Sequence, residues 1–109
     1  MKVYLDDTRQ TPEGWTRVYW PAEAIELLKT GNVTEISLDH DLGDKFNAKQ
    51  ENRNEITGYD VVIWIEEQVF TTDFSPPEIF VHSDNWAAKS RMIAGIESIK
   101  RLVAKRQNS

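Results

Sequence analysis

The chain has 109 residues, a formal net charge of −5 and no cysteine. This length fits one domain with a single hydrophobic core. The excess of acidic residues excludes a broad basic surface for nonspecific binding of nucleic acid, but it is compatible with a small nucleotide or an RNA end held at one point.

Three features favour a cytoplasmic protein. A small extracellular domain or a structural zinc site would normally use cysteine. Acidic residues interrupt the N-terminal stretch 1–7 before the apolar core of a signal peptide can form. The longest apolar run, 61–65, is too short to cross a bilayer. We therefore expect one cytoplasmic domain over residues 1–109, without membrane association and of unknown oligomeric state.

The N-terminal third predicts two strands and a helix. Residues 3–5 read as a short buried strand that stops at two acids, and residues 8–14 contain Pro12 and Gly14, which favour a loop. Residues 17–20 can form a second strand or an edge segment, because the connection is too short for a helical crossover. A helix is predicted to begin at Pro21 and to end at Gly31.

The middle of the chain predicts a strand, a loop and a buried helix. Residues 33–38 form the next predicted strand, which again ends in acids. Residues 42–57 are polar and lack periodicity, and we expect them to form a mobile loop over the strand ends. Thr57 can cap a helix over residues 58–70, whose apolar character indicates burial.

The last part predicts one strand and one long helix. Ser75, Pro76 and Pro77 break the chain before a strand over residues 78–81. Asp84 or Asn85 can then cap a helix that extends to about Lys105. Strands that alternate with helices predict an α/β fold of three layers, with a mainly parallel sheet of about four strands and helices on both faces.

Polar residues follow three of the predicted strands, and in open α/β sheets ligands bind beyond the carboxyl ends of the strands. They are Asp6, Asp7, Asp39, His40, Asp41, His82 and Ser83. The acids can be simple loop residues, and a single histidine is usually structural. Two histidines beside such partners are candidates for proton transfer near neutral pH. Arg9 can form a salt bridge or hold a phosphate through two hydrogen bonds.

Four sequence blocks resemble the cyclic-phosphate processing receiver domain family. They are L-D-D-x-R-x-T-P-x-G-W at 5–15, I-S-L-D-H-D-L-G at 36–43, T-G-Y-D-V at 57–61 and V-H-S-x-N at 81–85. Met92 also fits the family. The resemblance implies a fold derived from response-regulator receiver domains, and a role in binding or processing cyclic phosphates on nucleotides or RNA ends.

The resemblance also implies roles for individual residues. Asp6 and Asp7 resemble the acid pair that holds Mg²⁺ in a receiver domain, Asp39 resembles its phosphorylated aspartate, and Ser83 resembles its hydroxyl residue. Asn85 is marked by the last block. The lysine that follows the fifth strand of a receiver has no counterpart here, and this departure puts phosphorelay signalling in doubt.

Two functions of different classes follow. In the first, a phosphoesterase opens a cyclic phosphodiester: the catalytic residues are His40, His82 and Asp39, the substrate-binding residues are Arg9, Ser83 and Asn85, and Asp6, Asp7 and Asp41 hold Mg²⁺ or Mn²⁺. In the second, the chain is a noncatalytic module that senses a nucleotide or binds a protein partner. A weaker third possibility is phosphoacceptor signalling through Asp39.

Overall fold

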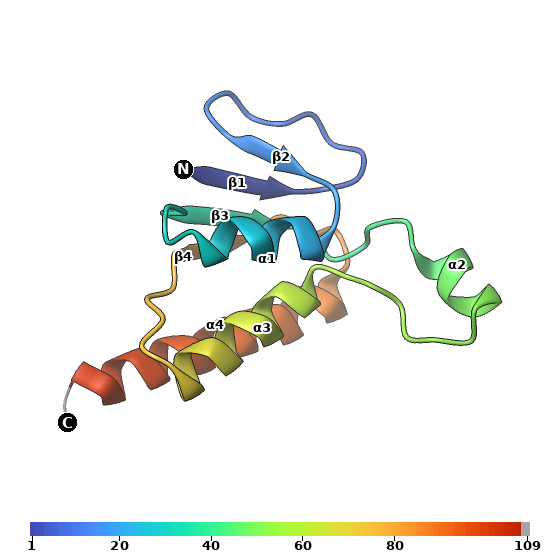
Figure 1. The fold of residues 1–109 in the computed structure, drawn as a ribbon. Helices are drawn as coiled ribbons and strands as arrows, with labels where there is room; N and C mark the ends of the chain where they lie inside the picture. Colours follow the sequence, from blue (N-terminus) through green and yellow to red (C-terminus); the bar gives the residue numbers. More distant parts are fainter. Residues whose placement is uncertain (108–109) are drawn as a thin grey trace.

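The computed structural model describes residues 1–107, which form one parallel sheet and four helices (Figure 1). The strands are β1 (Lys2–Leu5), β2 (Thr16–Val18), β3 (Glu35–Leu38) and β4 (Glu78–Val81), in the order β2-β1-β3-β4. The helices are α1 (Pro21–Lys29), α2 (Lys45–Gln50), α3 (Tyr59–Thr71) and α4 (Trp86–Gln107). All three strand pairs are parallel. The predicted fold class is confirmed as a truncated, receiver-like α/β fold.

The hydrophobic core lies on one face of this sheet. Val3, Leu5, Ile36 and Leu38 are fully buried and belong to one cluster with apolar residues of α1, α3 and α4. Both helical crossovers, β2-α1-β3 and β3-α3-β4, run in the same direction across the sheet. Because such crossovers are right-handed, their helices fall on the same face.

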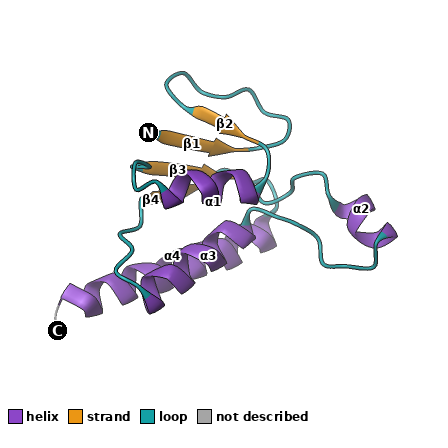
Figure 2. Ribbon diagram, in the orientation of Figure 1, coloured by secondary structure: helices purple, strands orange, loops and turns teal. Residues whose placement is uncertain are grey.

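Within residues 1–107, no helix covers the other face of the sheet, which differs from our expectation of helices on both faces. Tyr4, Ser37 and Phe80 are neighbours in the strand register, alternate with the core positions and lie outside the core cluster. Phe80 is 40% exposed. The physical reason is the β1–β2 connection, which is a loop instead of a helix (Figure 2).

Several predicted boundaries are shifted by one or two residues. The second strand is shorter than expected and lies at the edge of the sheet. The third helix begins with Gly58 as its N-cap, although the hydroxyl of Thr57 still accepts a hydrogen bond from the N–H of Tyr59. The predicted cap of the last helix is present: the side-chain oxygen of Asn85 accepts a hydrogen bond from the N–H of Ala88.

The prediction of a loop over residues 42–57 was wrong for its central part, because Lys45–Gln50 form the helix α2. Asp44 is buried and accepts two hydrogen bonds from the guanidinium of Arg53, which ties the two ends of the segment together. The segment projects beyond the carboxyl ends of the strands (Figure 1). A short polar helix closed by a distant ion pair has no apolar periodicity, so the sequence pattern could not reveal it. Its mobility stays a prediction.

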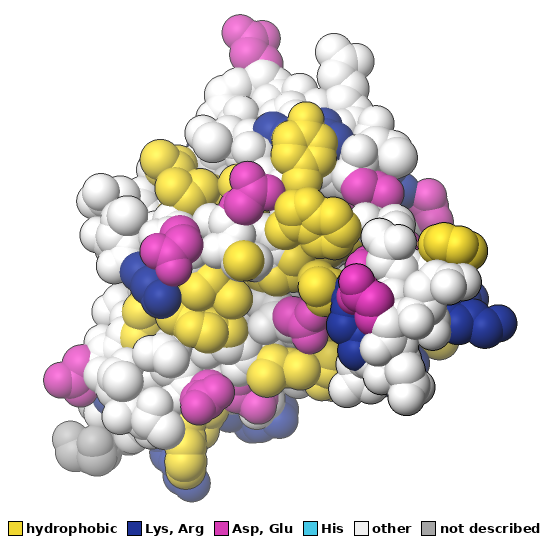
Figure 3. Space-filling view, turned by 45° about the vertical axis from the view of Figure 1, so that its right-hand side comes forward, with side chains coloured by type: hydrophobic (Ala, Val, Ile, Leu, Met, Phe, Trp, Pro, Cys, Tyr) yellow, Lys and Arg dark blue, Asp and Glu magenta, His cyan; other side chains and the backbone are white. Residues whose placement is uncertain are grey.

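On the face shown in Figure 3, acidic, basic and hydrophobic side chains are interspersed. No helix in the described part of the chain is both long and apolar enough to cross a membrane.

Gly58 allows the start of α3 to approach the end of β3. A Cβ atom at this position would lie 1.7 Å from the carbonyl oxygen of Asp39, and a backbone atom cannot move aside as a flexible side chain can. We expect Gly58→Ala to lower the free energy of unfolding by about 3 kcal/mol, measured by urea denaturation. Gly31→Ala is the control, because Gly31 has a φ of +78° but no atom within 4 Å of its added Cβ. An equal or smaller effect of Gly58→Ala than of Gly31→Ala would contradict the clash.

Candidate functional site

Three carboxylates converge where β1 and β3 end. Asp6, Asp7 and Asp39 each place an oxygen within 4.8 Å of the others. Two of them were predicted as metal ligands, and Asp39, predicted as catalytic, joins them. Asp41 was also predicted as a metal ligand, but it is not part of this group among the described residues. Asp6 and Asp39 directly follow β1 and β3, and Asp7 follows Asp6, so the parallel pairing of the two strands brings the acids together.

Asp6 is completely buried and strongly hydrogen-bonded. Its Oδ1 accepts hydrogen bonds from the backbone N–H groups of Thr8 and Arg9, both at 2.8 Å. Its Oδ2 lies 3.0 Å from Nε2 of His82. Burial raises the pKa of Asp6, but these donors more than offset it and bring the pKa below its usual range. Asp6 is therefore a fixed negative charge in the site.

The fixed charge of Asp6 affects the protonation of the neighbouring Asp39. Burial, and then the charge of Asp6, raise the pKa of Asp39 to about 6. The raised pKa means that nearby positive charges and hydrogen-bond donors do not fully balance the negative charge of the three carboxylates. An all-oxygen donor set with surplus negative charge is what Mg²⁺ or Mn²⁺ prefers. The residues present therefore fit a divalent cation.

His82 forms the link between this cluster and the open face of the sheet. Its Nδ1 lies 2.6 Å from the hydroxyl oxygen of Ser37, and its ring stacks on Tyr4 with centroids 4.2 Å apart. Burial lowers the pKa of His82, which favours the neutral ring. The carboxylate of Asp6 requires a proton on Nε2, so Nδ1 accepts the hydrogen bond from Ser37. Both ring nitrogens are occupied by protein groups.

His40 differs from His82 in having one ring nitrogen available. Its Nδ1 lies 2.7 Å from Oδ1 of Asp41, and its backbone N–H donates to Oδ1 of Asp39. No hydrogen bond within the described residues involves its Nε2. The two histidines therefore belong to separate hydrogen-bonded networks that both contact the carboxylate cluster.

Arg9 places a positive charge beside the carboxylate cluster. Its guanidinium donates to the backbone carbonyl of His82 and to Oδ2 of Asp84, the latter at 2.5 Å, and its Nε lies 3.9 Å from Oδ2 of Asp6. The side chain of Asp84 is 96% exposed, so this ion pair is weak in water. An anionic ligand can replace Asp84 at the guanidinium at little cost.

The remaining two predicted site residues have structural partners. The hydroxyl oxygen of Ser83 accepts a hydrogen bond from the N–H of Asn85, and Asn85 caps α4. Ser83 is also buried. Their predicted contact with substrate stays a prediction, and the geometry gives both a role in fixing the turn between β4 and α4.

A shallow pocket of about 300 Å³ opens above the cluster. It is lined by Asp7, Thr8, Arg9, Asp39, Asp41 and Asp84. A pocket of this size, with one arginine and several carboxylates, can hold a phosphate group together with a cation.

Sequence reasoning missed three residues that support the site. Tyr4 and Ser37 hold His82, and the guanidinium of Arg17 donates hydrogen bonds to the carbonyl oxygens of Asp6 and Arg9. One signal was present: a serine inside an otherwise apolar strand marks the face of the sheet away from the core. The partner of that serine could be identified only from the fold.

Asp39→Asn should make the protein more stable above pH 6. The folded-state pKa of Asp39 is raised, so its favourable contribution is complete below the unfolded pKa near 4 and is lost as the pH rises through about 6. The neutral amide avoids this loss, and we expect about 2 kcal/mol of added stability at pH 7.5, measured by urea denaturation from pH 4 to 8. Mg²⁺ should stabilise the wild type above pH 6 and have little effect on the variant. Parallel pH profiles for the two proteins would contradict the raised pKa.

No curated protein and no solved structure matches the chain. A family model described as "Cyclic-phosphate processing Receiver domain" matches residues 1–98, which include every residue of the site described above. The chain therefore belongs to the cyclic-phosphate processing receiver domain family.

Proposed function

We propose that this protein binds a cyclic phosphate on a nucleotide or an RNA end and opens it by hydrolysis. One observation carries the proposal: the acids Asp6, Asp7 and Asp39 gather within 4.8 Å beside Arg9, in a member of this family. This arrangement offers both a cation site and a guanidinium to an anionic ligand. In keeping with the absence of cysteine, we place the protein in the cytoplasm.

Asp6, Asp7 and Asp39 would hold Mg²⁺ or Mn²⁺. Such a cation supplies neutralisation of charge on phosphate oxygens and lowers the pKa of bound water. Its positive charge would also reduce the repulsion that these three carboxylates exert on an anionic substrate.

The residues of the chain then divide the remaining tasks. Arg9 releases the carboxylate of Asp84, binds the phosphate oxygens instead and so orients the cyclic phosphate of the substrate. His40 transfers a proton through Nε2, because Asp41 holds its Nδ1 proton and fixes the tautomer. The oxygen of water bonds to phosphorus, the bond from phosphorus to one ring oxygen breaks, and that oxygen takes up a proton. The product is a phosphomonoester.

His82 has a different task from the one that we expected from the sequence. With both ring nitrogens occupied, it acts as a positioning residue that fixes the orientation of Asp6. From the sequence we expected the two histidines to share the acid and base roles. In this proposal His40 alone transfers protons.

The proposal is tested by incubating the protein with 2′,3′-cyclic mononucleotides, with Mg²⁺ or with EDTA, and separating the products by chromatography. Conversion to a 2′- or 3′-monophosphate supports hydrolysis. Binding without conversion overturns the catalytic part and favours a noncatalytic sensor. A stable adduct of one phosphoryl group on Asp39, after treatment with a small phosphodonor, favours phosphoacceptor signalling instead.

A further inference from the structure

Trp86, a large aromatic residue, follows closely in sequence after Asp84 of the phosphate pocket, although it is not among the residues that line the pocket. Trp86 is the first residue of α4 and is 79% exposed. It follows Asp84 by two residues, and Asp84 lines the pocket and binds Arg9. Since consecutive Cα atoms are about 3.8 Å apart, the Cα atoms of Asp84 and Trp86 are at most about 7.6 Å apart.

The fold gives no structural reason for a tryptophan at this position. Asn85 already caps the helix, and Trp86 lies outside the core cluster. Within the described residues, its only ring contact is with the ammonium group of Lys89, 6.0 Å from the ring. By contrast, Trp15 packs against Tyr4 through its ring. An indole exposed in this way keeps the flat face opposite Lys89 accessible to a ligand.

We propose that Trp86 stacks on the nucleobase of a ligand whose cyclic phosphate occupies the pocket, so that the protein selects nucleotides and RNA ends over base-free cyclic phosphates. This inference rests on the proposed function. In such a ligand one ribose separates the base from the cyclic phosphate, and Trp86 is two residues from Asp84, which lines the pocket. Every nucleobase has a π-face, so stacking on indole selects for a base without selecting its sequence.

Lys89 adds a positive charge on the same side of the helix. It lies three residues after Trp86, and side chains at this spacing are neighbours on a helix. Its ammonium group lies 6.0 Å from the centroid of the indole ring. A cation at this position strengthens the attraction for a ligand that carries phosphate.

The test measures binding in Mg²⁺ by isothermal titration calorimetry with two slowly hydrolysed probes. These are adenosine 2′,3′-cyclic phosphorothioate and glycerol 1,2-cyclic phosphorothioate, which share the ring and differ in the base. Trp86→Ala should weaken binding of the adenosine probe about fivefold or more and leave the glycerol probe unchanged. Trp86→Phe should restore part of the loss, because it keeps an aromatic face.

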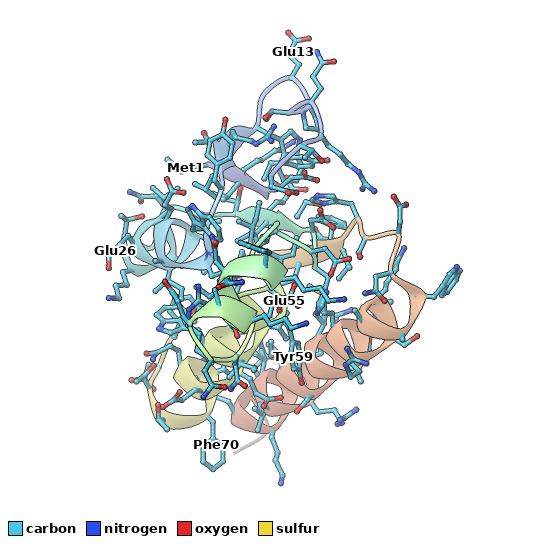
Figure 4. All side chains as sticks on the ribbon, turned by 90° about the vertical axis from the view of Figure 1, so that its right-hand side faces the viewer. Met1, Glu13, Glu26, Glu55, Tyr59 and Phe70 are labelled. Carbon is cyan, nitrogen blue, oxygen red and sulfur yellow. The ribbon has the colours of Figure 1, made fainter. Side chains whose placement is uncertain are left out.

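Phe70→Ala is the matched control. Phe70 is 74% exposed, and it lies near the far end of α3, at the lower margin of Figure 4. It should bind both probes as the wild type does. An unchanged ratio of the two dissociation constants in Trp86→Ala overturns the role of Trp86 and leaves the phosphate site intact. Failure of the wild type to bind either probe overturns both proposals.

Discussion

Replacing His40 with alanine should reduce turnover of a 2′,3′-cyclic nucleotide by about 10²- to 10⁴-fold, the usual contribution of a positioned acid or base. The fold should remain intact, because the ion-pair partner of His40 is exposed: the side chain of Asp41 is 58% accessible. The measurement is kcat from product chromatography, with thermal unfolding followed in parallel.

Two further variants separate proton transfer from structural support. Asp41→Asn removes the charge that holds the tautomer of His40 and should have a smaller effect on kcat than the loss of the imidazole. His82→Ala should instead lower stability, because its ring stacks on Tyr4 and bonds to Ser37 and Asp6. Unchanged turnover in His40→Ala would remove the proposed mechanism.

Asp6→Ala should destabilise the protein by about 3–5 kcal/mol, which is a large part of the stability of a small domain. The substitution removes a fully buried carboxylate and leaves without a partner the N–H groups of Thr8 and Arg9 and the Nε2–H of His82. The free energy of unfolding from urea denaturation at pH 7 measures the effect.

Asp6→Asn is the control, because asparagine keeps the shape of the side chain and removes its charge. Its amide oxygen can still accept the two backbone hydrogen bonds, and His82 can adopt the other tautomer, so the loss of stability should be much smaller than with alanine. The folded-state pKa of Asp6 is lowered, so its ionic contribution is present above the unfolded pKa near 4 and is lost as the pH falls through the folded pKa. The advantage of the wild type over Asp6→Asn should therefore shrink below pH 4. A cost of less than 1 kcal/mol for Asp6→Ala would show that the buried hydrogen bonds contribute little.

The strands and the polar residues at their ends could be predicted from the sequence, because both depend only on neighbouring residues. A buried strand such as β1 is a short apolar run, and the acids that follow it mark the point where the chain reaches the surface. Parallel pairing then makes the carboxyl ends converge without further information. For this reason the sequence alone assigns Asp6, Asp7 and Asp39 to one site, and the three carboxylates lie together in the structure.

The segment that contains α2 could not be predicted from the local sequence pattern. Its helix has only six residues, and an ion pair between the buried Asp44 and the exposed Arg53 holds its ends together. The guanidinium keeps the pKa of Asp44 at about 2, so the pair stays charged near neutral pH. A contact nine residues apart between two polar side chains has no periodicity, and the sequence pattern indicated only a loop.

The sequence by itself determined the order of the four strands and the three longer helices along the chain, the family and the set of acids at the site, since each depends on neighbouring residues or on a motif. Only the tertiary structure decided that the helices cover one face of the sheet, that His82 is held on both ring nitrogens, and that Nε2 of His40 is available. The physical reason is that these properties depend on contacts between residues far apart in sequence: His82 meets Ser37 across 45 residues and Asp6 across 76. Strand register and the handedness of the crossovers set those contacts, and no local pattern of residues records them.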